Sequence, residues 1–307
     1  MLPHKEISAH LHPEFNLKTT FQNSKRHETL FFLREDLIHP TIPGSKVRKL
    51  ASIFRFIEKN AIEKIHASGS FYSNNLIALI HFCKLLNVEA SFYAKESHQK
   101  HLKGNALSLV QENSRVGNLN IITKDEWPQI NEIMHQNANE KHLVIPEGAF
   151  MKEALPGLFT LGYDLLKFCQ DYSIKNLFLD AGTGITAASI LCYFGMHNHS
   201  KTNILITDMA NKRDDWENVL NQTQEWTEKF FKIKIEIPEY IWRKPATAKS
   251  FGAINATVKN AHKDLIDKES IQADIIYTAK NWQTVVEENS KQLYGEPSVF
   301  LVSGKEE

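Results

Sequence analysis

The stretch NLFLDAGTGITAAS, residues 176–189, decides the fold class. It reads as a short apolar strand, then the turn Gly182-Thr183-Gly184, then a helix rich in small residues. A strand that enters a helix through a glycine turn is typical of α/β proteins, and the backbone N–H groups at such a helix start can bind a phosphate. The turn lacks the lysine of a P-loop and the spacing of a dinucleotide fingerprint. A simple connection and a phosphate site are therefore both open interpretations.

The same order of strand and helix recurs along most of the chain. Apolar runs predict strands near residues 30, 65, 90, 119, 142, 176 and 202, and segments of helical period predict helices near residues 45, 74, 103, 154, 185 and 214. The final third is less regular until the segment ADIIYTAKNWQTVVEE at 273–288 and an apolar run at 298–304. Such alternation predicts parallel sheets covered by helices, with ligands at the carboxyl ends of the strands. The 307 residues fit two sheets better than one.

The composition favours a small-molecule partner. Acidic and basic residues balance at 36 each, so no global charge attracts nucleic acid or an anionic membrane. The amino-terminal segment has no apolar core of signal-peptide length, and no apolar stretch is long enough to span a bilayer, so we expect a cytoplasmic protein. Cys83, Cys169 and Cys192 are widely spaced among apolar residues, which predicts buried thiols rather than disulfides or a metal site.

The stretch TIPGSKVRKLASIF, residues 41–54, places a candidate chemical group at the start of a helix. If Ser45 caps this helix, Lys46 is its first residue. A lysine in a charged stretch is usually a surface group. A partly desolvated lysine at the positive end of a helix is less readily protonated, which suits a Schiff-base nucleophile. The helical period predicts Lys46 in an inward row with Leu50, Ile53 and Ile57, Arg48 on the solvated face with Ser52 and Arg55, and Lys49 to the side.

A second turn, ASGSFYSNNLIAL at residues 67–79, also leads from a strand into a helix. Ser73 is placed to cap this helix, and capping alone would explain the serine. As part of a site, the free N–H groups of the helix start would hold a substrate carboxylate. The Ser73 hydroxyl would then lie nearby for proton transfer or attack.

Six segments, taken together and in order, resemble a known family over nearly the whole chain. They are LREDLIHPTIPGSKVRKLA (33–51), YSNN (72–75), IPEGAFMKEALPGLFTLGY (145–163), GTGIT (182–186), DIIYTAK (274–280) and VSGK (302–305). They are similar to the corresponding motifs of pyridoxal-phosphate enzymes with the tryptophan synthase β fold, specifically the group of 1-aminocyclopropane-1-carboxylate (ACC) deaminase and D-cysteine desulfhydrase.

The resemblance implies an α/β fold of two lobes, each a mostly parallel twisted sheet covered by helices. It implies a larger cofactor-binding domain at 1–50 and 165–307, and a smaller inserted domain at 51–164. The implied cofactor is pyridoxal 5'-phosphate, and the implied assembly is a homodimer. The resemblance assigns the catalytic roles to Lys46, Ser73 and Tyr277, the cofactor contacts to Lys46, Asn74, Gly182, Thr183, Gly184, Ile185, Thr186 and Ser303, and the substrate pocket to Tyr72, Asn75, Phe251 and Thr278.

Several positions depart from the family pattern. Ser45 replaces an asparagine, Tyr72 a glutamine, Ile185 and Ala279 each a glycine, and Val302 and Lys305 replace the outer residues of the last motif. Phe251 stands where a second active-site tyrosine is expected, so one phenol that could donate or accept a proton is lost.

The resemblance implies a lyase that acts on a small amino acid and releases a keto acid and ammonia, with sulfide where the substrate is cysteine. The hydroxyls of Thr278 and Ser303, where the deaminase has a glutamate and a leucine, favour the desulfhydrase branch. A serine opposite the pyridine nitrogen would leave that nitrogen unprotonated, which the family associates with elimination. Three alternatives remain: ACC deaminase, a divergent cofactor-binding protein with weak or different activity, and a nucleotide-binding α/β protein that uses the GTGIT turn.

Overall fold

The computed structural model describes residues 7–42, 44–96, 105–210, 213–250 and 252–305. Contacts divide the chain into two compact units, each described here by itself. The larger unit comprises residues 16–45 and 158–306, and the smaller unit comprises residues 1–15, 46–157 and 307. Among the helices of these ranges, none is both long and apolar enough to cross a membrane.

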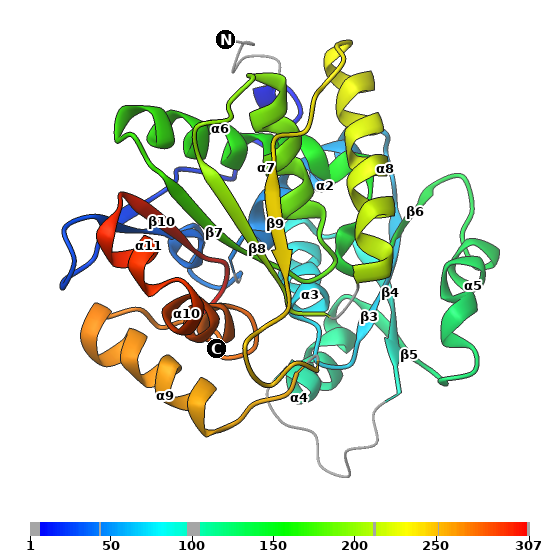
Figure 1. The fold of residues 1–307 in the computed structure, drawn as a ribbon. Coiled ribbons are helices and arrows are strands. Elements are labelled where there is room, and N and C mark those ends of the chain that lie inside the picture. Colours follow the sequence, from blue (N-terminus) through cyan, green and yellow to red (C-terminus); the bar gives the residue numbers. More distant parts are fainter. Residues whose placement is uncertain (1–6, 43, 97–104, 211–212, 251, 306–307) are drawn as a thin grey trace. The chain divides into compact units, whose positions relative to one another are not determined.

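The larger unit is built on a six-stranded sheet in the order β1-β2-β10-β7-β8-β9 (Figure 1). Only the edge strand β1 runs antiparallel to its neighbour, and the other pairs are parallel. Parallel strands buried on both faces are nearly continuous apolar runs, as the predicted strand at 176 is. The bounds are β1 Phe21–Asn23, β2 Leu30–Arg34, β7 Asn176–Ala181, β8 Asn203–Asp208, β9 Tyr240–Arg243 and β10 Ser298–Val302.

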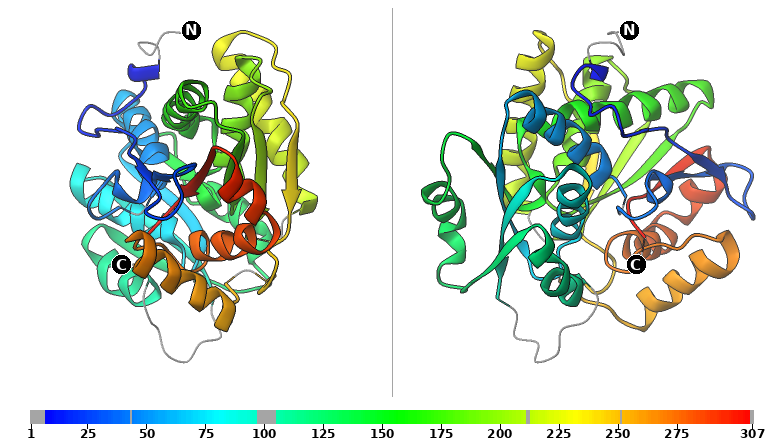
Figure 2. Two further views of the ribbon diagram at one scale, coloured as in Figure 1. Left: turned by 60° about the vertical axis from the view of Figure 1, so that its left-hand side comes forward. Right: turned by 180° about the vertical axis from the view of Figure 1, so that it is seen from behind.

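Helices cover both faces of this sheet, as right-handed crossovers require. The chain steps from β7 through β8 to β9 in one direction and returns to β10 on the other side of β7, which puts the returning helices on the opposite face (Figure 2). The ring of Phe159 in α6 contacts rings of α7 and α8. The bounds are α6 Leu155–Asp171, which begins in the smaller unit, α7 Ile185–Met196, α8 Arg213–Phe231, α9 Ala256–Asp264, α10 Thr278–Glu288 and α11 Ser290–Gly295.

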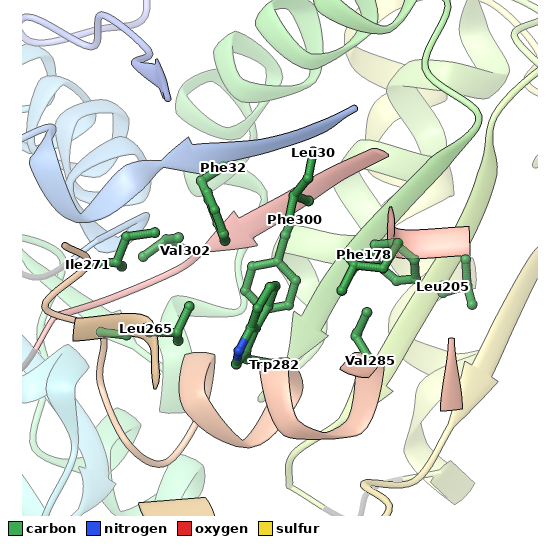
Figure 3. Close-up of a cluster of buried hydrophobic side chains, with 12 residues drawn as sticks. Leu30, Phe32, Phe178, Leu205, Leu265, Ile271, Trp282, Val285, Phe300 and Val302 are labelled. Atoms are coloured by element: carbon green, nitrogen blue, oxygen red, sulfur yellow. The ribbon is translucent and has the colours of Figure 1, made fainter. Parts of the chain in front are cut away.

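The core between the sheet and the returning helices is aromatic. Trp282 of α10 contacts Phe300 of β10 edge to face, with ring centroids 5.2 Å apart, and it also contacts Phe32 of β2 (Figure 3). Phe178 of β7 and Val285 of α10 belong to the same buried cluster. Because side chains alternate along a strand, Asp180 shares the face of Phe178, which is the face that α10 covers.

The smaller unit holds a four-stranded, fully parallel sheet in the order β5-β4-β3-β6. On one face of it, Ile130 and Met134 of α5 pack against Tyr93 and Ile122. The bounds are β3 Lys64–Ser70, β4 Glu89–Lys95, β5 Gly117–Ile122, β6 His142–Ile145, α2 Lys46–Lys59, α3 Asn74–Leu86, α4 Asn105–Glu112 and α5 Ile130–Gln136.

Most predicted elements are confirmed, but the predicted faces of α2 are partly wrong. Arg48 and Ser52, expected on a solvated face, are 0% and 3% exposed, and Lys49, expected at the side, is 5% exposed. The reason is that α2 has a second neighbour, since a Cβ built on Gly157 would lie 1.8 Å from the Arg48 carbonyl oxygen. The predicted inward row is confirmed for Leu50, Ile53 and Ile57, and the three cysteines are buried.

Candidate active site

The glycine turn and Ser303 both lie at the carboxyl edge of the larger unit's sheet. β7 ends at Ala181 and β10 ends at Val302, and these strands are adjacent and parallel. The glycine turn therefore follows one strand, and Ser303 follows its neighbour. Ligands of open α/β sheets bind at this edge.

The glycine turn leaves the start of α7 open to an anion. Gly184 is the residue before the helix and has φ 93°, a conformation that favours glycine, and no side chain caps the helix start. The first helical hydrogen bond runs from the Ala188 N–H to the Gly184 carbonyl, so the preceding N–H groups have no partner within the helix. Ile185, where a glycine is expected, begins the helix with its side chain buried, so it needs no glycine conformation.

Tyr277 lies directly on this turn. A Cβ built on Gly182 would come within 3.0 Å of the Tyr277 ring and 3.3 Å of its hydroxyl. The Tyr277 N–H donates to Asp274 Oδ1 at 2.7 Å, which fixes the backbone that carries the ring. The structure thus brings the two predicted residues Tyr277 and Gly182 together.

Ser303 is held in a buried network of hydroxyls and carboxylates. Its Oγ donates to Asp180 Oδ2 at 2.7 Å and lies 3.4 Å from Thr278 Oγ1. Thr278 Oγ1 in turn donates to Asp274 Oδ2 at 2.8 Å. All four residues are at most 8% exposed. Buried carboxylates need such donors to remain ionised at low cost.

The segment before Lys46 is fastened to the same place. The Ser45 N–H donates to the Ser303 carbonyl at 3.3 Å. Gly44 has φ +55°, and a Cβ there would lie 1.7 Å from that carbonyl oxygen, so only glycine permits the approach. Lys46 is the next residue after Ser45 in the chain, and it begins α2 as predicted.

In the smaller unit, Lys46 has a second lysine one helical turn away. Lys49 is buried, and its Nζ donates to the Gly148 carbonyl at 2.7 Å. Burial, together with the charge of Lys46, lowers the pKa of Lys49 to about 7. Lys46 itself is half-buried. Gly148 lies in the IPEG segment and has φ +69°.

The predicted cap at the second turn is confirmed. Ser73 Oγ accepts hydrogen bonds from the Asn75 N–H at 3.2 Å and the Leu76 N–H at 3.4 Å, and α3 begins at Asn74. A Cβ on Gly69 would lie 3.0 Å from Ser73 Oγ, so the strand end approaches the serine closely. Asn75 is 5% exposed, and within the described part of the chain neither polar atom of its amide has a hydrogen-bond partner. Such a group costs free energy unless a ligand satisfies it.

Four of the other predicted residues are neither fully buried nor fully exposed. Tyr72, Asn74, Thr183 and Thr186 are half-buried. Phe251 lies outside the described residues. The adjoining loop is anchored by Lys280, whose buried Nζ donates to the carbonyls of residues 248 and 250. Burial lowers the pKa of Lys280.

Sequence reasoning missed Asp180, Gly44 and Lys49. One signal was present for Asp180, which is the only charged residue in an otherwise apolar strand segment, LFLDA. Gly44 lies within the stretch 41–54, but the sequence alone does not reveal its close approach to another strand end. For Lys49 the helical wheel gave the wrong signal, because it assumed a single buried face.

The residues present fit pyridoxal phosphate. The open helix start after Gly184 offers N–H donors for a phosphate, Ser303 offers a buried hydroxyl for a ring nitrogen, and Lys46 offers an amine for the aldehyde. Across the described residues no group of three or more histidine, cysteine, aspartate or glutamate side chains is arranged to hold a metal ion.

Comparison with solved structures decides the fold. A solved ACC deaminase homologue matches 98% of this chain and 95% of its own, with a TM-score of 0.82 and 18% sequence identity. The chain has the fold of this homologue. A hydrogen sulfide-producing enzyme from Fusobacterium nucleatum matches 99% of this chain and 98% of its own, with a TM-score of 0.64 and 11% identity. A fungal L-serine ammonia-lyase from Rhizomucor miehei matches 94% of this chain and 95% of its own, with a TM-score of 0.65 and 10% identity.

These likenesses confirm the predicted α/β fold of the tryptophan synthase β type. No protein-family model and no curated protein matches the sequence.

Proposed function

We propose that this chain is a pyridoxal-phosphate-dependent lyase that removes ammonia from a small amino acid. The observation that carries the proposal is the segment Gly44-Ser45 on the Ser303 carbonyl, immediately before Lys46, beside the open glycine turn. The fold supports it, since the solved neighbours include an ACC deaminase homologue and a serine ammonia-lyase. Within this class we propose desulfhydrase-like elimination, a cytoplasmic location and a homodimer. We also propose a larger domain at 1–50 and 165–307 and an inserted smaller domain at 51–164.

Pyridoxal phosphate, when bound, draws electrons from the α-carbon of an attached amino acid. Lys46 Nζ would hold the cofactor and later take the α-proton. The N–H groups after Gly184 would bind the phosphate. The free side-chain amide of Asn75 would orient the substrate carboxylate, and Ser73 Oγ would move a proton beside it. The Tyr277 ring, fixed on Gly182, would exclude water from the turn.

The test begins with the purified protein and added pyridoxal phosphate. We expect a visible absorption band that survives dialysis, is absent in Lys46→Ala and is retained in the control Lys59→Ala, which changes a lysine in the last turn of the same helix. Borohydride reduction followed by peptide mass analysis should find the cofactor on Lys46. Attachment to Lys49 would refute the assignment. Keto-acid release is then measured across a panel of small D- and L-amino acids.

A second candidate is a cofactor-binding protein of different activity. The buried Asp180 beside Ser303 favours it, because the family motif alone does not predict a carboxylate there. A stable absorption band with no keto acid from any member of the panel would support this candidate over the lyase. Absence of any band would refute both.

A further inference from the structure

The hydroxyl of Ser303 has one proton, and its hydrogen bonds show where that proton goes. Ser303 Oγ lies 2.7 Å from Asp180 Oδ2, and the side chains are 5% and 8% exposed. An ionised carboxylate only accepts hydrogen bonds, whereas a serine hydroxyl has one donor and two acceptor positions. The short contact to the carboxylate therefore takes the serine proton and leaves Ser303 Oγ with lone pairs only.

Thr278 does not change this assignment of the Ser303 proton to Asp180. Its Oγ1 lies 2.8 Å from Asp274 Oδ2 and 3.4 Å from Ser303 Oγ. The shorter bond to a carboxylate is the stronger one, so the threonine proton belongs to Asp274. Asp274 also accepts the N–H groups of Tyr277 and Thr278, which keeps it in place as an acceptor.

We propose that Asp180 is a positioning residue that makes Ser303 a hydrogen-bond acceptor toward the ring nitrogen of pyridoxal phosphate. The inference rests on the proposed function, because it needs that cofactor in the site. An acceptor is satisfied by a ring nitrogen that carries a proton and is left unsatisfied by a neutral one. The negative charge of Asp180, one hydroxyl away in a buried site, favours the protonated ring further.

The protonation state of the ring nitrogen inferred here is the opposite of the one that a serine without a carboxylate partner implies. A serine free to donate would bond to an unprotonated ring nitrogen, the state expected from the family motif. When its hydroxyl donates to Asp180, the same serine accepts a hydrogen bond from a protonated ring nitrogen and so stabilises the pyridinium. A pyridinium withdraws more electron density from the attached substrate than a neutral ring does. The position of Asp180 is consistent with a selected role, because a carboxylate on the core face of β7 is costly without a donor.

The test reads the ring nitrogen directly and needs no turnover. The protein is loaded with pyridoxal phosphate labelled with nitrogen-15 in the ring, and the nitrogen resonance is compared with free cofactor at acid and alkaline pH. We expect the pyridinium shift in the wild type and the neutral-pyridine shift in Asp180→Asn and Ser303→Ala. The matched control Thr278→Val, which removes the other hydroxyl of the network, should keep the pyridinium shift.

Each outcome separates this inference from the function. A neutral ring nitrogen in the wild type overturns the inference, even if Asp180→Asn and Ser303→Ala both fail to fold. A pyridinium that persists in Asp180→Asn and Ser303→Ala also overturns it, while lyase activity could remain. Failure to bind the cofactor refutes the proposed function and the inference together.

Discussion

Replacing Gly44 with alanine should detach the segment that leads into Lys46. The glycine has φ +55°, and a Cβ would lie 1.7 Å from the Ser303 carbonyl oxygen and 2.6 Å from its carbon. Both atoms are backbone, so no flexible side chain can move aside. The segment must shift, and the hydrogen bond from the Ser45 N–H to the same carbonyl is lost with it.

The expected cost follows from these two contributions. A left-handed conformation costs an alanine about 1–2 kcal/mol relative to glycine, and the lost backbone hydrogen bond costs about 1 kcal/mol. Gly44→Ala should therefore lower the free energy of unfolding by about 2–3 kcal/mol, since the two losses occur together. The chain offers a matched control in the same unit. Gly252 has φ +71° with no atom within 4 Å of a built Cβ, so Gly252→Ala should cost only the conformational part.

Urea unfolding measures both variants. At an unchanged slope, the midpoint of Gly44→Ala should fall further than that of Gly252→Ala, by an amount that corresponds to about 1 kcal/mol. The loaded protein gives a second reading, because Gly44→Ala should also weaken pyridoxal phosphate binding whereas Gly252→Ala should not. Equal midpoints for the two variants would refute the close approach to Ser303. Unchanged cofactor binding in Gly44→Ala would refute the role of this contact in presenting Lys46.

Three further predictions follow from single contacts. The pKa of Lys49 is lowered to about 7 in the folded protein, so above that pH the unfolded chain binds more protons than the folded one. The free energy of unfolding should therefore rise between pH 7 and the ordinary lysine pKa. Urea titrations at several pH values should show this rise in the wild type and a flatter dependence in Lys49→Met. Burial and the neighbouring His142 lower the pKa of His66 to about 4. The free energy of unfolding should therefore fall as the pH drops from the ordinary histidine pKa toward 4. An NMR titration of the His66 imidazole that gives an ordinary histidine pKa would contradict this prediction. Ser73→Ala should cost about 1 kcal/mol through the lost cap and should also lose activity, whereas Ser73→Asn should keep the stability and still lose activity.

The sequence predicts the regular parts of this fold because burial and periodicity agree there. The strand at 176–181 is mostly apolar and buried throughout, and the following helix begins at the predicted residue, Ile185. β9, at Tyr240–Arg243, was missed because it is an edge strand with only partial burial. Its apolar run, Tyr240–Trp242, has only three residues and no clear alternation, so pairing with β8 is what defines the strand.

The network around Ser303 lies beyond sequence reasoning for a different reason. The motif at 302–305 identifies the serine, but its partner Asp180 is 123 residues away in the chain. Whether a hydroxyl donates or accepts depends on which group its proton reaches, and no local pattern carries that information. The sequence predicts that Ser303 belongs to the site, whereas its hydrogen-bonding role becomes visible only because β7 and β10 are adjacent.

The case for Lys46 changes for a related reason. The helical period singled it out because it shares an inward row, yet Arg48 at 0% and Lys49 at 5% exposure are buried more deeply than the half-buried Lys46. Burial on α2 therefore does not distinguish Lys46, the proposed Schiff-base lysine, from its neighbours. What distinguishes Lys46 is its chain position directly after Gly44 and Ser45, which the Ser303 carbonyl holds in place. A lysine moved by one turn along α2 would keep the burial and lose this attachment, so the glycine and not the amphipathic pattern is the better marker of the site.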